Sequence, residues 1–472
     1  MPRPSSTEFS LDDAALEQRL EQDEHEKKAV LAALAGTVQH FFGGWGHLFH
    51  RVADPRMQAL ILYPVVSLAL AGILMYATHL KARRQIGLQL RGNGSSADHF
   101  RTLTGVAACP HGDTVNATFK RMNPEDFQTV VTGMTETLIR QKVLYRYRLL
   151  ERHFLVVVDG TGVVTFTERH CPYCLTATHG GQTIYYHPVL EAKLVTFGGL
   201  VFSLLTEFIE NPGEFPKKQD CELKAFYRLA ERLQQRFPRL PICLLLDGLY
   251  AGGPTFALCQ KYRWKYIIVL QEGDLSSVHQ EFEALLHLAP DNHLRFLPAP
   301  SADTVVQQDF RWVNEIAYVD TERREHTVSV LECLETTRDE DGQPQTTRFK
   351  WVTNFTVTAK RVTTLANEGG RLRWKIENEG FNIQKNGGFE LEHVYSQDPT
   401  ASKIFYFLLQ MAHTLLQLVE HGSLFRKAFP AGVGSSKNIA VRLLEAWRNV
   451  RLSLAEWEHC LTARFQIRLD TS

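Results

Sequence analysis

The chain has 472 residues and a mass of 53.8 kDa, which favours roughly two to four structural units over one domain. Hydrophobic residues make up 44% of it and charged residues 22%, a globular composition that excludes collagen-like, mucin-like or wholly disordered proteins. The 52 Lys and Arg residues balance 52 Asp and Glu residues. Zero net charge argues against a general polyanion binder but allows a local basic groove.

The cysteines and the N-terminal residues predict a cytoplasmic protein. Eight cysteines are spread irregularly over the chain, too sparsely for the disulfide framework of a secreted domain. Residues 1–34 carry acidic side chains where a signal peptide would have a basic region followed by an apolar one. We therefore expect no secretion signal.

One segment raises the question of a membrane anchor. Residues 57–80 contain no Asp, Glu, Lys or Arg and exceed the roughly 20 apolar residues that a bilayer span needs. Lys81, Arg83 and Arg84 follow, as they would on the cytoplasmic side of a span. A helix buried on all sides is the favoured interpretation, because the flanking segments are amphipathic and supply no reason for a single span. We expect no membrane partner, and a single-span membrane protein stays as the alternative.

The first 150 residues predict an all-helical region. Apolar residues recur at helical spacing over 11–34, and further helices are expected over 57–90 and 113–150. Residues 100–150 are a candidate module for gripping DNA ends, and a charged, solvated face is an equal alternative. The basic side chains concerned are Lys120, Arg121, Arg140, Lys142, Arg146 and Arg148.

From residue 151 the pattern changes to strands. The apolar, β-branched run at 154–166 is interrupted by Gly160 and Gly162, which predicts two strands joined by a tight turn, and strands over 185–197 and 199–209 would complete a meander. A helix over 219–237, an apolar strand over 242–246, a helix over 253–262 and a strand over 265–270 follow. Residues 151–300 therefore predict a partly parallel sheet covered by helices.

The remaining chain predicts an insertion and a return to helices. Alternating patterns over 301–360 indicate a β-rich, antiparallel insertion with a hairpin. Helical character returns over 361–425, and 426–472 is expected to form a C-terminal helical segment. The fold class is therefore α/β, with a mixed sheet flanked by helices.

Two aspartates are candidate functional residues because of where they lie. Asp159 ends the run LVVVD, Asp247 ends the run CLLLD, and each is followed by glycine. Ligands bind at the carboxyl ends of strands in α/β sheets. The alternative is that each aspartate only caps a turn. A carboxylate pair on neighbouring strands would need a shared proton or a cation, and Mg²⁺ prefers such oxygen ligands.

A third acid is available in the segment 371–386. Glu377 follows Arg373 by four residues on the same helical face, and Lys385 lies about two turns further on. Basic groups beside an acid suit a site that handles phosphates. Ordinary Arg/Glu pairing on a solvated helix is the alternative, and Glu379 competes with Glu377 for the position.

The order LVVVDGTG, CLLLDGLY and RLRWKIENEGFNIQKN resembles the DDE transposases of bacterial insertion sequences, in particular those whose third acid lies in an Arg-Trp-x-Ile-Glu motif. The resemblance covers residues 150–420. It implies an RNase H-like catalytic domain, interrupted by the β-rich insertion between the second and third acids.

The resemblance also implies roles for particular residues. Asp159, Asp247 and Glu377 would form the catalytic triad and hold Mg²⁺ or Mn²⁺, with two ions in the site. Arg373, Trp374 and Lys385 would contact DNA. The expected activity is metal-dependent strand cleavage at insertion-sequence ends and strand transfer into target DNA. The expected partners are double-stranded DNA, as terminal inverted repeats and target, and further copies of this chain in a dimer or higher synaptic assembly. A transposase-like DNA-binding protein without catalysis is a further alternative.

Cys171 and Cys174 form a Cys-x-x-Cys pair that does not belong to this constellation. Three histidines, His170, His179 and His187, lie near it in the sequence. A closed zinc site needs four ligands, and a second cysteine pair is absent, although the distant Cys221 is a possible partner. No thioredoxin-like setting supports a redox pair. A turn whose geometry is fixed by Pro172 is the favoured interpretation.

Overall fold

The computed structural model describes residues 13–213, 216–298, 305–338, 342–463 and 466–470. The described chain forms two compact units. The helical unit comprises residues up to Val130 together with Gly387–Glu390 and Asp398–Asp470. The sheet unit comprises Val131–Asn386 and Leu391–Gln397.

Helices make up the described secondary structure of the helical unit. They are α1 (Asp13–Phe42), α2 (Trp45–Leu48), η1 (Gln58–Leu60), α3 (Val65–Ala77), η2 (Ile86–Leu90), α4 (Ser95–Thr104), α5 (Gly112–Phe119), α12 (Pro399–Glu420), α13 (Ser423–Ala428), α14 (Ser436–Asn449) and α15 (Leu454–Thr462). Helix α6 (Pro124–Arg140) starts in this unit and ends in the other.

The apolar stretch 57–80 folds as a buried helix. Helix α3 has only 13 residues, shorter than the helix expected over 57–90, and every residue from Ser67 to Ala77 in it is buried. It packs against α12, and a Cβ added at Gly72 would lie 2.6 Å from a methyl carbon of Leu408. Within the described residues, no helix is long and apolar enough to cross a membrane.

The sheet unit contains ten described strands in one mixed sheet. They are β1 (Phe154–Phe166), β2 (Leu175–His179), β3 (Gln182–Val195), β4 (Val201–Phe208), β5 (Ile242–Leu246), β6 (Lys265–Val269), β7 (His293–Phe296), β8 (Val305–Val319), β9 (Glu325–Arg338) and β10 (Pro344–Thr353). The helical segments of this unit are η3 (Tyr145–Tyr147), α7 (Glu222–Arg236), η4 (Gly248–Tyr250), α8 (Gly253–Tyr262), α9 (Ser276–Leu286), α10 (Val362–Asn367), η5 (Gly370–Trp374), η6 (Ile376–Asn382) and α11 (Ile383–Asn386).

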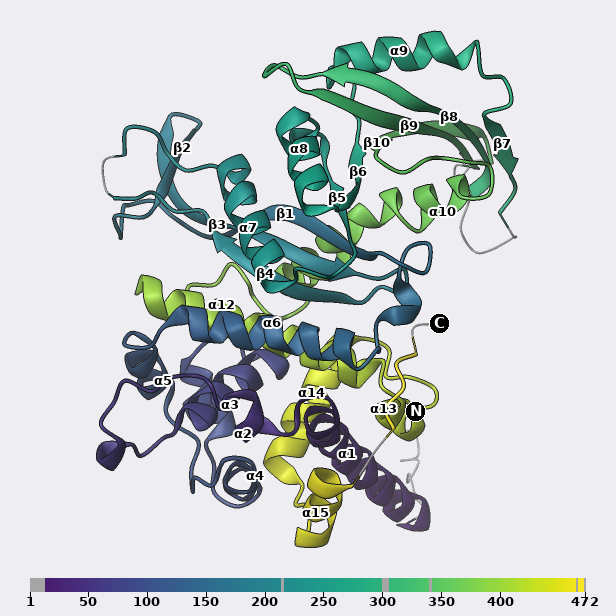
Figure 1. Cartoon of the computed structure of the whole chain (residues 1–472). Coiled ribbons are helices and arrows are strands. Elements are labelled where there is room, and N and C mark those ends of the chain that lie inside the picture. Colours follow the sequence, from purple (N-terminus) through teal and green to yellow (C-terminus); the bar gives the residue numbers. More distant parts are fainter. Residues whose placement is uncertain (1–12, 214–215, 299–304, 339–341, 464–465, 471–472) are drawn as a thin grey trace, which may run out of the picture. The chain divides into compact units, whose positions relative to one another are not determined.

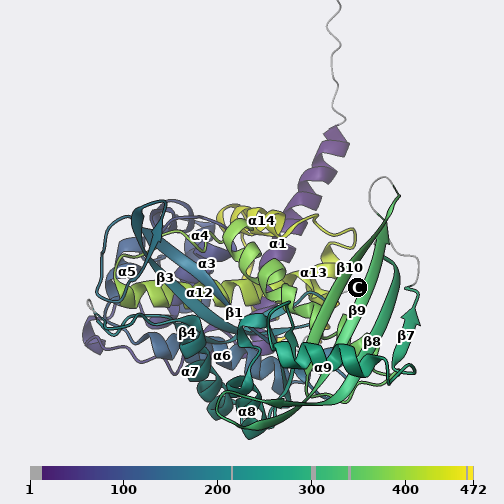
Figure 2. The same ribbon diagram turned by 90° about the horizontal axis from the view of Figure 1, so that it is seen from above.

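The strand order is β2-β3-β1-β5-β6-β10-β9-β8-β7, with β4 also paired to β3. Strands β1, β5 and β6 are parallel, whereas the other pairings are antiparallel. The α/β class and the mixed sheet expected from the sequence are therefore confirmed. The antiparallel strands expected near 305–358 also form, but β10 pairs with β6, so they extend the central sheet. Figure 2 shows these strands side by side, with α9 lying across them.

The predicted turn inside 154–166 is wrong. Strand β1 runs through Asp159, Gly160 and Gly162 without a break, and β3 pairs along it from Leu155 to Phe166. The register shifts between Gly162 and Val164, so this glycine lies at a β-bulge. The long partner strand supplies the hydrogen bonds that a hairpin turn would have removed. Asp159 consequently lies within a strand and not at its end.

The candidate site lies at the edge of one hydrophobic core cluster. This cluster lies between the sheet and the segment α10–η5–η6, and it contains Leu155 and Val157 of β1, Cys243 and Leu245 of β5, and Ile376 of η6. Because side chains alternate along a strand, the next residues on this face are position 159 of β1 and position 247 of β5. Both aspartates therefore lie on the face that carries η5 and η6, at the edge of the core.

Candidate functional site

Asp159 and Asp247 occupy matching positions on neighbouring parallel strands. The pairing of β1 with β5 ends at Val157 opposite Leu245. Each aspartate lies two residues beyond this last pair, so the two carboxylates project from the same face at the same height. The expectation that the two aspartates lie on neighbouring strands is confirmed, whereas the expected strand end at Asp159 is wrong because β1 continues to Phe166.

Each aspartate also makes a local hydrogen bond. The backbone N–H of Leu249 donates to Asp247 Oδ1 at 2.9 Å, as expected from the turn-capping alternative. The backbone N–H of Gly160 donates to Asp159 Oδ1 at 3.0 Å. These contacts hold Oδ1 of each side chain, and neither of them involves Oδ2.

Arg373 of η5 reaches Asp159. Its Nη1 atom lies 3.5 Å from Asp159 Oδ2, and its guanidinium lies over the Trp374 ring at 4.3 Å from the centroid. The Arg373 side chain is only 12% exposed, and its Nε atom is buried without a hydrogen-bond partner among the described residues. A buried donor without a partner indicates that an acceptor is missing from the free chain. Arg373 is therefore placed to bind an anionic group beside Asp159.

Glu222 is a third acidic residue beside the aspartate pair, and the sequence does not predict it. It is the first residue of α7, and a Cβ added at Gly160 would lie 2.6 Å from its Oε2 atom. The Tyr250 hydroxyl donates to Glu222 Oε1 at 2.7 Å. The glycine therefore leaves room for the Glu222 carboxylate next to β1. Its only sequence signal is an acid at the start of a strongly amphipathic helix, which is common at helix N-termini.

Burial and mutual repulsion disfavour negative charge on these carboxyls. Burial raises the pKa of Asp159 from 3.8 to about 6; the Arg373 guanidinium opposes this rise, and the Glu222 and Asp247 carboxylates add to it. Burial also raises the pKa of Glu222, against the hydrogen bond from Tyr250 and together with repulsion from Asp247. Three acids that repel one another favour a cation in the space between them.

Glu377 and Glu379 lie on the π-helical segment η6, which packs against β1. Glu377 is exposed and makes no ion pair or hydrogen bond within the described part of the chain. Glu379 is half-buried and pairs with Lys375, while its Oε2 atom is buried without a hydrogen-bond partner there. Insertions of this helical form often occur at functional sites. The structure places the Glu377 element on the correct face but brings neither glutamate into contact with Asp159.

Lys385 lies one element further along, in α11. Its ammonium forms an ion pair with Glu392 at 3.0 Å, and both residues belong to the sheet unit. Arg373 thus contacts the aspartate pair directly, whereas Lys385 has a partner of its own.

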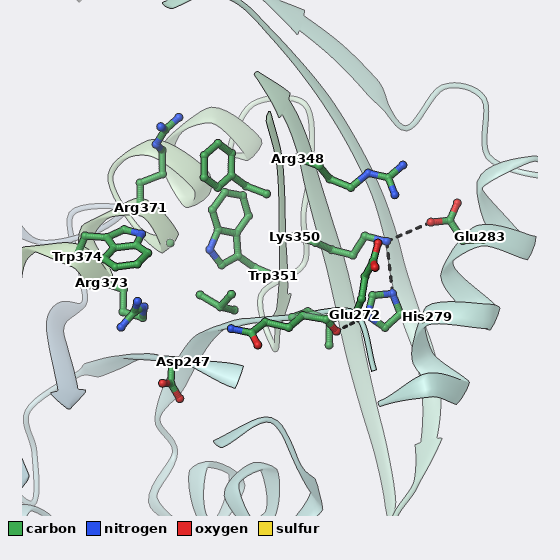
Figure 3. Close-up of a pocket in the computed structure, with 15 residues that line it drawn as sticks. Asp247, Glu272, His279, Glu283, Arg348, Lys350, Trp351, Arg371, Arg373 and Trp374 are labelled. Atoms are coloured by element: carbon green, nitrogen blue, oxygen red, sulfur yellow. Dashed lines mark hydrogen bonds and ion pairs between the residues drawn. The ribbon is translucent and has the colours of Figure 1, made fainter. Parts of the chain in front are cut away.

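A pocket of about 860 Å³ opens beside Asp247 (Figure 3). Asp247 lies at one end of it, and Arg373 and Trp374 line the wall formed by η5. The opposite wall comes from β10 and α9. There Lys350 pairs with Glu283 at 3.1 Å. The other lining residues are Val269, Leu270, Gln271, Glu272, His279, Arg348, Phe349, Trp351, Gly370 and Arg371.

Basic and aromatic side chains therefore share the pocket with a carboxylate of the aspartate pair. Arg348 is held by the buried Glu332, with Nε 3.2 Å from Oε1, and Arg371 is held by Glu335. These ion pairs hold the two guanidinium groups in place, but Glu332 also pairs with Arg311 and Lys350, so it offsets only part of the charge of Arg348.

The sequence pair Cys171 and Cys174 forms a second cluster at a different place in the sheet unit. Together with His170 and His187, these residues bring four possible ligand atoms within 4.8 Å of one another. Cys221, considered as a distant partner, is exposed and is not in the group. The side chain of His179 is outside the described set.

Comparison with known proteins gives no relative: no protein-family model and no curated protein matches the chain.

Proposed function

We propose that this chain is a DNA transposase of the DDE type, which cleaves DNA at the ends of an insertion sequence and joins those ends to target DNA. The observation that carries the proposal is the aspartate pair. Asp159 and Asp247 stand at matching positions on adjacent parallel strands, and Arg373 is bound to Asp159. A carboxylate pair with a neighbouring guanidinium suits a phosphodiester better than a neutral substrate.

The strand order supports an RNase H-like catalytic domain. Strands β1, β3 and β4 form an antiparallel meander, and β5 and β6 add to β1 in parallel, which gives the order β4-β3-β1-β5-β6. The insertion strands follow β6 in the chain and precede the segment with Glu377. This is the order of parts that the resemblance to DDE transposases implies.

The acidic residues fit divalent metal ions by their chemistry. Asp159, Asp247 and Glu377 would hold two Mg²⁺ or Mn²⁺ ions, since hard cations prefer carboxylate oxygens. Their charge would offset the burial that mainly raises the pKa of Asp159 and the repulsion from Glu222 and Asp247 that adds to it. When bound, the ions supply positive charge that activates an attacking oxygen and stabilises the leaving one. Glu377 would have to move toward the aspartates, which its exposed and unpaired carboxylate permits.

The other residues would orient the DNA. Arg373 offers a buried, unsatisfied donor to a phosphate next to the scissile bond. Trp374 is 55% exposed beside it and can stack on a base that leaves the duplex. Lys385 would contact the backbone further from the reaction. Two ends must be joined in transposition, so we infer that the chain acts as a dimer or higher assembly.

The proposal is tested by strand cleavage on labelled duplexes taken from the two stretches of genomic DNA that flank the coding sequence. We expect Mg²⁺-dependent nicks at a fixed position, abolished by EDTA. A shuffled duplex of the same composition serves as the control.

Binding to one of these duplexes without any cleavage in Mg²⁺ or Mn²⁺ would instead support a transposase-like DNA-binding protein. The absence of both binding and cleavage would contradict both functions.

A further inference from the structure

We infer that His170, Cys171, Cys174 and His187 form a structural zinc site. His170, Cys171 and Cys174 belong to the loop between β1 and β2, and His187 belongs to β3. Strand pairing places His187 opposite Val164, close to where β1 ends, so it faces the loop that carries the other three. The sheet therefore brings His187 together with three residues that precede it by 13 to 17 positions.

The spacing of the ligand atoms matches a tetrahedral zinc site. The Cys171 and Cys174 sulfurs lie 3.4 Å apart, and His187 Nε2 lies 3.3 Å from the first and 3.2 Å from the second. His170 Nδ1 lies 3.4 Å from Cys174 Sγ. A tetrahedron with Zn–S of about 2.3 Å and Zn–N of about 2.0–2.1 Å separates its ligand atoms by roughly 3.3–3.8 Å. A small outward movement would accommodate the ion.

The ligand chemistry selects zinc over the magnesium proposed for the acidic site. Two thiolates and two neutral imidazoles balance the charge of Zn²⁺ and are its common structural ligands, whereas Mg²⁺ prefers oxygen. Cys174 is fully buried and Cys171 is 8% exposed, whereas His170 is exposed and His187 is half-buried. Four protein ligands would fill the coordination sphere and leave no position for water. Such closure is typical of a structural and not a catalytic zinc. Both cysteines are free thiols in this structure.

The loop between β1 and β2, which carries three of the four ligands, would also support the start of α7 beside the aspartate pair. Asn211 Nδ2 donates to the Cys174 carbonyl at 2.7 Å, and the Asp220 N–H donates to Asn211 Oδ1 at 3.2 Å. Gln219 accepts from the Thr176 N–H at 2.6 Å. These contacts hold the residues that lead directly into α7, whose first residue is Glu222. A metal that orders the loop would therefore fix where α7 begins.

The proposal is tested on the purified full-length chain by metal analysis and by cobalt substitution. We expect one zinc per chain after purification without chelator. Protein stripped under reducing conditions should take up one Co²⁺ and develop the sulfur-to-cobalt charge-transfer and visible d–d absorption of a tetrahedral thiolate site. The absence of zinc together with a cobalt spectrum lacking these bands would overturn the proposal.

Matched cysteine variants assign the ligands. Cys174→Ser should lose the bound zinc, whereas Cys221→Ser should keep it, because Cys221 lies outside the cluster. Zinc retained at full occupancy in Cys174→Ser would overturn the assignment. If Cys174→Ser does not fold, the cobalt spectrum of the parent protein decides on its own.

Hydrogen exchange tests the supporting role. Removal of zinc should accelerate exchange of the Thr176 and Asn211 amides, which are bonded across the loop, more than that of amides in the β5–β6 pairing. Unchanged exchange at both amides after complete zinc removal would contradict this role. None of these measurements depends on DNA cleavage.

Discussion

Ionisation of the Asp159 carboxyl destabilises the folded protein. Its pKa is raised to about 6 from 3.8, so the folded chain holds this proton more tightly than the unfolded chain does. Stability from this group is therefore fully present below pH 3.8 and is lost as the pH rises through about 6. A pKa difference of about two between the folded and unfolded states changes the free energy of unfolding by about 3 kcal/mol at most.

Asp159→Asn should accordingly stabilise the metal-free protein at pH 7.5, by up to about 3 kcal/mol, and by much less at pH 4.5. Thermal unfolding of both proteins in EDTA at the two pH values measures the difference. A variant less stable than the parent at pH 7.5 would show that the Arg373 ion pair outweighs burial and repulsion.

Variants of the two glutamates in η6 can distinguish a metal-binding residue from a structural one. Glu377 is exposed and unpaired within the described residues, whereas Glu379 pairs with Lys375. We predict that Glu377→Gln lowers the cleavage rate by about 100-fold or more, because a ligand of the reacting centre is lost. Glu379→Gln, with the same chemical change two residues away, should retain most activity. The reverse order of the two rates would assign the third acid to Glu379.

A buried ion pair within strand β3 lies against segment η6. Lys193 Nζ lies 3.3 Å from Glu191 Oε2, both side chains are almost fully buried, and the ammonium lies 5.5 Å from the centroid of the Phe381 ring. Ser203 donates to the same carboxylate at 2.7 Å. Burial lowers the pKa of Lys193, which the Glu191 carboxylate opposes.

Lys193→Met should destabilise the protein by about 3–5 kcal/mol, because it leaves the Glu191 charge buried without its cation. The double variant Glu191→Gln with Lys193→Met should recover most of this loss. Urea unfolding midpoints of the parent and both variants provide the measurement. A single variant as stable as the parent would contradict the inference that the pair holds this region together.

The sequence predicts some elements well because the signal is local. The apolar runs that lead to Asp159 and Asp247 identify β1 and β5, and the helical character expected within 361–425 corresponds in part to α12. The bulge at Gly162 is not readable, because a glycine pair also fits a turn and only pairing with the distant β3 decides between them. Strand β2 is short and depends on the same partner.

The residues of the candidate sites also differ in whether a local sequence pattern predicts them. Glu222 has no motif of its own, and its place beside β1 is created by the start of α7 and by the missing side chain at Gly160. His187 becomes a partner of the Cys-x-x-Cys pair only through the register of β1 with β3. Contacts of this kind depend on how distant strands and helices pair in the sheet. Local patterns in a single sequence do not reveal that pairing.

The balanced charge of the whole chain sets an expectation for DNA binding. With 52 basic and 52 acidic residues there is no general positive field, and the pocket arginines Arg348 and Arg371 are already paired. Binding to unrelated duplex DNA should therefore be weak at 150 mM salt, with Kd at or above about 10⁻⁵ M. Fluorescence anisotropy on a shuffled duplex measures it. A submicromolar Kd would indicate a basic surface that the ion pairs do not offset.

The proposed transposase activity requires the aspartate pair to hold the metal ions that cleave DNA. The most direct measurement compares the rate of Mg²⁺-dependent nicking on the flanking duplexes for the parent, Asp247→Asn and Asp291→Asn. Asp291 is exposed and makes no ion pair among the described residues, so it controls for loss of an acid. We predict that Asp247→Asn binds the duplex but nicks at the background rate, while Asp291→Asn nicks like the parent. Nicking by Asp247→Asn at the parent rate would show that the aspartate pair does not cleave DNA.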